Sequence, residues 1–275
     1  MKKVLLAFDC TQFSNGAFEF ARRMNESEKI LLTGAFLPHI NYSTLWSYAS
    51  GEHGSLLMPP VEGEEKEAMD RNIAHFSTMC RKHDIDCSIH REFFDFALPE
   101  FRAETRFADL VILSSQVFFG THGTLESSEY LRDALHAAEC PVVIVPEKFE
   151  YPASNILAYD GSASSVFAIK QFSYLFPELC DNKTWLVTLS DDNSTHLPHE
   201  ENIEELAERH FSYLHMIRLN LDPDEYFGAW MDVQKTKPIL IAGSFGRSFL
   251  SRLLKKSFIT EIITKYKFPV FISHR

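Results

Sequence analysis

The chain repeats one strand–helix pattern twice, and this repeat limits what it can fold into. One apolar run ends in Asp9 near the start, and another ends in Asp160 past the middle. The closing strands correspond too, because a Pro-Val pair opens the apolar runs at 141–145 and 269–272. Repeated halves of this kind indicate one fold used twice, with two corresponding sites that are free to diverge.

Strands alternate with helices in both halves. In the first half, apolar runs and helical spacing predict strands at 4–8, 29–36, 85–93, 110–113 and 142–145 and helices at 13–24, 64–83, 98–107 and 126–138. In the second half they predict strands at 155–159, 184–190, 216–220, 238–242 and 269–272 and helices at 163–176, 200–214, 223–232 and 250–266. This alternation predicts an α/β protein of two tandem doubly wound domains, 1–147 and 153–275. Each is expected to be a five-stranded, mainly parallel sheet flanked by helices.

Composition excludes several classes of protein. A net charge of −11 over 275 residues argues against nucleic-acid binding, which needs a basic surface. The apolar run after Lys3 is too short for a signal peptide or a membrane span. The five cysteines have no CxxC spacing, so we expect a cytoplasmic protein with reduced, mostly buried thiols. Cys10 has no basic partner in sequence and is expected to be inert.

A glycine-containing basic segment follows the fourth strand of the second half. Ligands bind open parallel sheets beyond the carboxyl ends of the strands, where the strand order reverses. Asp160 and Gly243 both lie there if the first and fourth strands are neighbours. Glycine lets a ligand approach the main chain, and a helix start attracts phosphate. The segment up to Ser257 has no acidic residue and four basic ones: Arg247, Arg252, Lys255 and Lys256. It therefore predicts an anion nearby.

These residues resemble the universal stress protein family, whose motif is Gly, two residues, Gly, nine residues, then Gly and Ser or Thr. Gly243, Gly246 and Ser257 match the motif, and Lys256 stands where the family has its third Gly. The resemblance covers essentially the whole chain. It implies two tandem domains of the adenine nucleotide alpha hydrolase-like fold.

The resemblance further implies that ATP, accompanied by Mg²⁺, binds in the second domain. The adenosine end would lie against Asp160, with the base held by main-chain groups near Thr188 and Leu189. Gly161 and Ser162 would shape the turn after the first strand. The residues implied along the ribose and phosphates are Gly243, Ser244, Gly246, Arg247, Lys256 and Ser257. No catalytic residue and no protein ligand to a metal is predicted.

The first half departs from the motif. The residues at the corresponding positions are Ser115, Phe118 and Glu129. A phenylalanine at a close-approach glycine blocks space, and a glutamate repels phosphate. Gly120 and Gly123 could form a glycine loop, but their positions do not match those of the motif glycines. We predict that the first site is degenerate and that Asp9 caps its turn.

Simpler structural interpretations stand beside these. The tripeptide at 160–162 alone is typical of a turn or helix cap, and the basic run at 247–256 suits a solvated face. The predicted loop over about 38–62 is compatible with a flap, with a surface for a protein partner, or with a segment that covers the core of its own domain. Its aromatic residues are Tyr42, Trp46 and Tyr48.

A histidine pair has the spacing of metal ligands. His196 and His199 lie in a polar loop without a third ligand placed to join them. A solvated loop is therefore the expected interpretation.

Three functional classes remain. The first is a stress-response or regulatory protein that binds an adenine nucleotide, and the second is a scaffold of the same family that binds none. The third is a slow ATPase, which we disfavour because no general base is evident at the loop. The family resemblance also implies that 142–145 pairs antiparallel with 270–272, which would make the chain an intramolecular pseudo-dimer. We further expect homodimerisation and a protein partner whose identity the sequence does not give.

Overall fold

The computed structural model describes residues 1–9, 12–37, 63–90, 97–115, 135–189, 196–219, 236–243 and 262–273. Two compact units, Met1–Val142 and Val143–Arg275, make up the chain. No helix within these ranges is long and apolar enough to cross a membrane.

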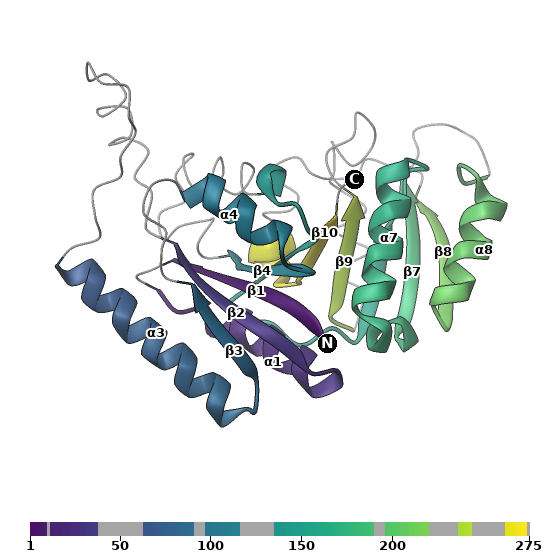
Figure 1. The fold of residues 1–275 in the computed structure, drawn as a ribbon. Helices are drawn as coiled ribbons and strands as arrows, with labels where there is room; N and C mark the ends of the chain where they lie inside the picture. The colour runs from purple at the N-terminus through teal and green to yellow at the C-terminus, as the bar shows by residue number, and fades with distance from the viewer. Residues whose placement is uncertain are drawn as a thin grey trace, which may run out of the picture. The chain divides into compact units, whose positions relative to one another are not determined.

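The first unit contains a parallel sheet in the order β3-β2-β1-β4. Its elements are β1 (Lys2–Asp9), α1 (Asn15–Ser27), β2 (Ile30–Leu37), α3 (Glu64–Lys82), β3 (Asp86–His90), α4 (Ala97–Arg106) and β4 (Leu110–Ser114), shown in Figure 1. Every residue of β4 is buried, whereas β3, at the sheet edge, is partly exposed. A strand buried on both faces must be apolar throughout, which explains why 110–113 reads as a continuous apolar run.

Aromatic packing joins α1 and α3 to the sheet of the first unit. Phe76 of α3 makes T-shaped contacts with Phe18 of α1 and Phe36 of β2, at ring centroid distances of 6.3 and 6.0 Å. All three rings are buried. Such edge-to-face pairs are favoured by the ring quadrupoles, so this cluster fixes both helices on one face of the sheet.

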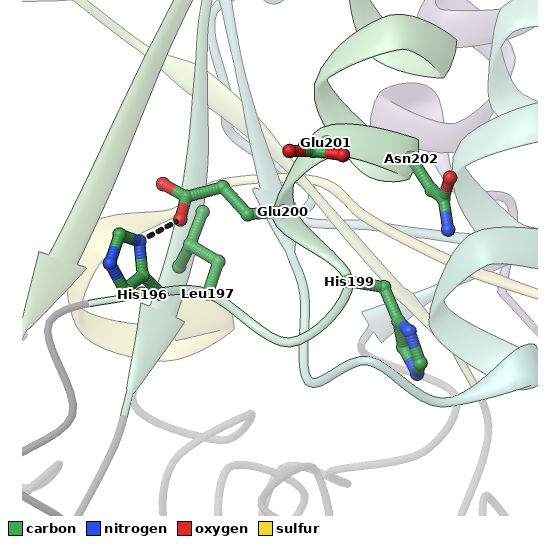
Figure 2. Close-up of a pocket in the computed structure, with 6 residues that line it drawn as sticks. All are labelled: His196, Leu197, His199, Glu200, Glu201 and Asn202. Atoms are coloured by element: carbon green, nitrogen blue, oxygen red, sulfur yellow. Dashed lines mark hydrogen bonds and ion pairs between the residues drawn. The ribbon is translucent and has the colours of Figure 1, made fainter.

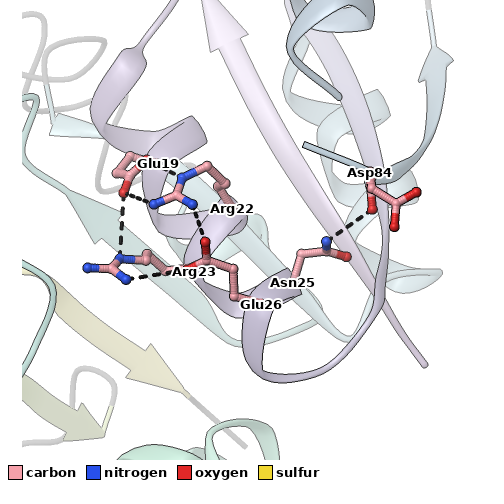
Figure 3. A network of polar contacts seen from close by, with 6 residues as sticks. All are labelled: Glu19, Arg22, Arg23, Asn25, Glu26 and Asp84. Carbon is pink, nitrogen blue, oxygen red and sulfur yellow. Dashed lines mark hydrogen bonds and ion pairs between the residues drawn. The ribbon is translucent and has the colours of Figure 1, made fainter. Parts of the chain in front are cut away.

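The exposed face of α1 carries a network of ion pairs (Figure 3). Arg22 donates to Glu19 at 2.6 Å and also pairs with Glu26, and Arg23 donates to Glu26 at 3.3 Å. The partners are three and four residues apart, which places them side by side on a helix. Exposed pairs of this kind contribute about 0–1 kcal/mol each, so the network supports the helix only modestly.

Asn25 makes a different contact on the buried side of α1. Its Oδ1 accepts a hydrogen bond from the backbone N–H of Ile30 at 3.2 Å, and its Nδ2 donates to the Asp84 carbonyl at 3.2 Å. Figure 3 shows this second contact. Asp84 has a left-handed φ of 52°, a conformation that aspartate tolerates better than most residues. Asn25 thus connects the start of β2 to the turn between α3 and β3.

Glu139 joins α4 to the segment before β5 (Val142–Val145). Arg102 Nε donates to its Oε1 at 2.8 Å, and Arg106 Nε donates to its Oε2 at 2.6 Å. The hydrogen bonds from Arg106 and Arg102 lower the pKa of Glu139 to about 2. Two arginines therefore hold one carboxylate in its charged form.

In the second unit, the strand order β9-β6-β7-β8 repeats the order β4-β1-β2-β3 of the first. Its sheet has the order β5-β10-β9-β6-β7-β8, and the described pairings from β10 to β8 are all parallel. Besides β5, its elements are β6 (Ser154–Ala158), α7 (Ala163–Leu175), a 3-10 helix (Pro177–Asp181), β7 (Lys183–Leu189), α8 (Glu200–His210), β8 (Tyr213–Leu219), β9 (Pro238–Gly243), a π-helical turn (Ile262–Tyr266) and β10 (Val270–Ser273). Figure 1 shows α7 lying along the sheet, where it contacts β9 and β10. The prediction of an α/β fold with parallel sheets is confirmed.

Element boundaries differ most around α8. The predicted helix at 200–214 ends at His210, and the predicted strand at 216–220 begins earlier, at Tyr213. The full-length parallel pairing of β8 with β7 explains the difference, because Lys183 already pairs with Tyr213. Pairing with β7 therefore outweighs the local pattern that predicts a longer helix.

Candidate functional site

The strand order of the second unit reverses between β6 and β9. β6 pairs with β9 on one side and β7 on the other, in parallel in both cases. The carboxyl ends of all three strands therefore lie at the same edge of the sheet. This confirms that the first and fourth strands of the second half are neighbours, which makes this edge the expected place for a ligand.

The Asp160–Ser162 turn connects β6 to α7. The Ser162 N–H donates to Asp160 Oδ1 at 2.9 Å, and the Ser165 N–H donates to Ser162 Oγ at 3.2 Å. Gly161 has φ +76°, a conformation that favours glycine. All three residues therefore have a structural role as a turn and an N-cap. That role is compatible with a ligand beside them but does not require one.

Gly243 ends β9 directly against the first turn of α7. A Cβ at this position would lie 2.5 Å from the Ser164 carbonyl carbon and 2.7 Å from the Ser165 backbone nitrogen. Only a residue without a side chain allows this approach. The family resemblance implies a ligand contact at this glycine, and the structure shows that close packing between helix and strand also requires it.

Two hydroxyl groups near this edge are buried without a hydrogen-bond partner. Thr188 lies near the end of β7 and Ser273 at the end of β10, with 3% and 1% of their surface exposed. In the described part of the chain, neither Thr188 Oγ1 nor Ser273 Oγ has a partner. An unsatisfied buried polar group costs about 1–3 kcal/mol, so each hydroxyl calls for an explanation. Ser273 was not predicted, although a polar residue ending an apolar strand was a readable signal.

Tyr159 and Pro198 close one side of the turn, and neither is among the site residues predicted from the sequence. The Tyr159 hydroxyl donates to the Pro198 carbonyl at 2.7 Å. A Cβ on Gly161 would lie 2.5 Å from the Pro198 Cβ. Burial, with the nearby charge of Asp160, raises the pKa of Tyr159, so its hydroxyl stays protonated and donates. The segment before α8 is thereby held against the end of β6.

A shallow pocket lies at the start of α8 (Figure 2). His196 Nδ1 lies 2.8 Å from Glu200 Oε2, and His199 points away from that pair. The pocket is lined by His196, Leu197, His199, Glu200, Glu201 and Asn202. No group of three potential metal ligands occurs in the described ranges. Within them, the two histidines do not converge on a common point.

Much of the predicted glycine motif lies outside the described residues. The second-half positions concerned are Ser244, Gly246, Arg247, Lys256 and Ser257, together with the side chain of Leu189. In the first half, Ser115 is buried directly after β4. The other first-half positions, Phe118, Gly120, Gly123 and Glu129, lie outside, as do Cys10, the aromatic loop residues Tyr42, Trp46 and Tyr48, and the helix expected at 223–232.

The fold matches solved structures of universal stress proteins over the whole chain. A universal stress protein from Archaeoglobus fulgidus DSM 4304 matches with a TM-score of 0.69 at 16% identity, covering 100% of this chain and 96% of the other. A putative universal stress protein from Pseudomonas aeruginosa UCBPP-PA14 matches with a TM-score of 0.52 at 14% identity, covering 99% and 93%. A functionally unknown protein from Pseudomonas aeruginosa PAO1 gives 0.52 at 11%, covering 99% and 92%.

No protein-family model matches the chain, and no curated protein matches it. Identities this low define the fold alone. The chain therefore has the universal stress protein fold, the adenine nucleotide alpha hydrolase-like arrangement that the residue motif predicted.

Proposed function

We propose that this protein is a universal stress protein-like regulator that binds ATP, with Mg²⁺, at the carboxyl edge of β6, β7 and β9. The fold supports the class of protein. The reversal of strand order between β6 and β9 supports this location for the ligand. Asp160 and Thr188 would lie near the adenosine. Gly243 and the basic segment after it would follow the ribose and phosphates.

The buried hydroxyl of Thr188 carries this proposal. Folding removes it from water without supplying a partner among the described residues, and a ligand at this edge is one group that would compensate for that cost. The same residue was predicted from the sequence as part of the base-binding strand end. An adenine ring offers both donors and acceptors at its edge, so it can satisfy a hydroxyl that lies beside it.

The test is calorimetric titration of nucleotide-stripped protein with Mg-ATP, using Thr188→Val as the variant. Valine keeps the shape and removes the hydroxyl, so we expect the free energy of unfolding to be unchanged or slightly higher. Loss of one neutral hydrogen bond should weaken ATP binding about 3- to 10-fold. Wild-type affinity in this variant would remove Thr188 from the site.

Thr184→Val is the matched control on the same strand. Thr184 Oγ1 accepts from Asn155 Nδ2 at 2.9 Å and donates to the Asn182 carbonyl at 3.0 Å. Its loss should destabilise the fold by about 1–3 kcal/mol and leave ATP affinity unchanged. An equal loss of affinity in both variants would indicate an indirect effect of stability.

Substitution of Gly243 is unsuitable as a binding test. Any side chain there would displace the first turn of α7, so lost binding would not identify a contact with the ligand. Arg247→Ala with Ser257→Ala tests the phosphate side better, because both changes shorten a side chain. One site per chain, weakened in this double variant, is the expected result.

The alternative is a protein of this fold that binds no nucleotide and serves as an interaction scaffold. Lys256 replaces the third motif glycine, and Asp160 and Gly243 each have a structural role that needs no ligand. A folded wild type that gives no heat with Mg-ATP would favour this alternative. We propose no dedicated catalysis. ATP turnover that is lost in the Arg247 and Ser257 variant would instead establish the ATPase class.

We also propose a cytoplasmic location and a pseudo-dimer within one chain. β5 and β10 are neighbours in the sheet of the second unit, and antiparallel pairing between them remains a prediction. Light scattering on the full chain tests whether it dimerises further.

A further inference from the structure

Cys87 of β3 faces α3. A Cβ added to Gly34 of β2 would meet the ring of Phe76, so this face of β2 lies under α3. Leu32, two residues before Gly34, shares that face and pairs with Cys87 in the parallel register. Paired residues in a sheet point to the same side, so Cys87 points towards α3.

The opposite face of β3 gives an independent check. His90 Nδ1 lies 2.8 Å from Glu104 Oε2 on α4. Residues three apart in a strand point to opposite faces. Cys87 is therefore directed away from α4, in agreement with the register.

Cys80 lies on the matching side of α3. It follows Phe76 by four residues, about one helical turn, and therefore lies on the same helix face. The Ile85 N–H donates to the Cys80 carbonyl at 3.0 Å, which folds the chain back from α3 into β3. Cys80 and Cys87 thus lie on facing surfaces of α3 and β3, and the Cys87 thiol is one of the groups that raise the pKa of Cys80.

The two thiols differ in access to solvent. Cys80 is fully buried, whereas Cys87 is exposed. Burial is the main cause that raises the pKa of Cys80, so this sulfur remains a protonated thiol and is protected from direct attack. An accessible sulfur beside a shielded one is the arrangement in which the first is oxidised and the second resolves it.

We propose that Cys80 and Cys87 form a reversible disulfide when the protein meets a hydroperoxide. The Cys87 thiolate attacks the peroxide, so an S–O bond forms, the O–O bond breaks and an alcohol or water leaves. The Cys80 sulfur then displaces the hydroxyl group of the Cys87 sulfenic acid. The S–S bond forms, the S–O bond breaks, and water leaves with the Cys80 proton. The sulfurs lose two electrons in total and the peroxide gains them.

The sequence between the two cysteines makes the bond simple to detect. Trypsin cleaves after Arg81 and Lys82, which separates Cys80 from Cys87 into peptides 72–81 and 83–91. The full-length protein is treated with hydrogen peroxide, blocked with a thiol alkylating reagent and digested without reductant. We expect the two peptides to be recovered as one cross-linked species that dithiothreitol separates.

Single variants distinguish this pair from general oxidation. Cys80→Ala should abolish the cross-link and convert Cys87 to sulfinic acid, because no resolving thiol remains. Cys180→Ser is the matched control, since Cys180 is also buried, with a pKa raised to about 12 by burial, and should leave the cross-link unchanged. Separate peptides in the peroxide-treated wild type would overturn the proposal. So would Cys87 joined to a different cysteine in a protein whose circular dichroism shows it to be folded.

Discussion

A methyl group at Gly243 should destabilise the second unit more than a methyl group at Gly34 destabilises the first. Both glycines lie in parallel strands beneath a helix. At Gly243 the added Cβ would be 2.5 Å from the Ser164 carbonyl carbon, well inside the contact distance of about 3.5–4.0 Å. At Gly34 it would be 3.0 Å from the ring of Phe76 and 3.1 Å from that of Phe36, so a displacement of a few tenths of an ångström relieves the overlap.

The change in the free energy of unfolding for each glycine-to-alanine substitution is the sum of two opposing terms. Replacing glycine with alanine stabilises a compatible site by about 0.4–1 kcal/mol, because the unfolded chain loses freedom. Overpacking costs about 1–3 kcal/mol, and the upper part of that range applies at Gly243 because main-chain atoms cannot rotate away. The net loss should be about 1–2.5 kcal/mol for Gly243→Ala, and Gly34→Ala should lie near zero.

Hydrogen exchange measured peptide by peptide is the appropriate assay, since a chain of two units need not unfold in one step. Amides of α7 should exchange about 5- to 70-fold faster in Gly243→Ala, which corresponds to that loss of free energy. Peptides of α1 and α3 should be unchanged. The reasoning fails if α7 keeps its wild-type protection, or if Gly34→Ala is the more damaging substitution.

Three further predictions concern stability. Asn25→Leu leaves the N–H of Ile30 without its acceptor and should cost about 1–3 kcal/mol in urea unfolding; a neutral result would contradict the buried contact. Glu139 has a folded pKa lowered from 4.5 to about 2, so its pairing stabilises the fold above pH 4.5 and is lost as pH falls towards 2. The stability difference between wild type and Glu139→Gln should therefore shrink over that interval, and a constant difference would refute it. Gly161→Ala should lower the melting temperature through its φ of +76° and its contact with Pro198, and Pro198→Gly should relieve part of that loss.

The tandem α/β architecture could be predicted because it depends on local patterns. Residues 4–7 and 156–159, in the runs that lead to Asp9 and Asp160, are buried, and their apolar composition follows from burial on both faces. Ser162 could be assigned as a cap for a similar reason, since capping depends on a few neighbouring residues.

Element ends were less predictable where pairing overrides propensity. The residues from 211 to 214 are predicted as the end of a helix, but β8 begins at Tyr213 because it pairs with β7 from that residue onward. Similarly, nothing in the sequence places Pro198 on Gly161, or Cys87 beneath α3, because these contacts join separate elements.

By itself, then, the sequence determined the class of fold, the repeat and the side of the sheet where a ligand is expected. These depend on periodicity and strand order, which are written along the chain. Only the tertiary structure decided why Gly243 must be glycine, which buried hydroxyls lack a partner among the described residues and which two thiols lie on facing surfaces. Each of these depends on the distance between atoms far apart in sequence, and that distance is fixed only when helix and sheet pack together.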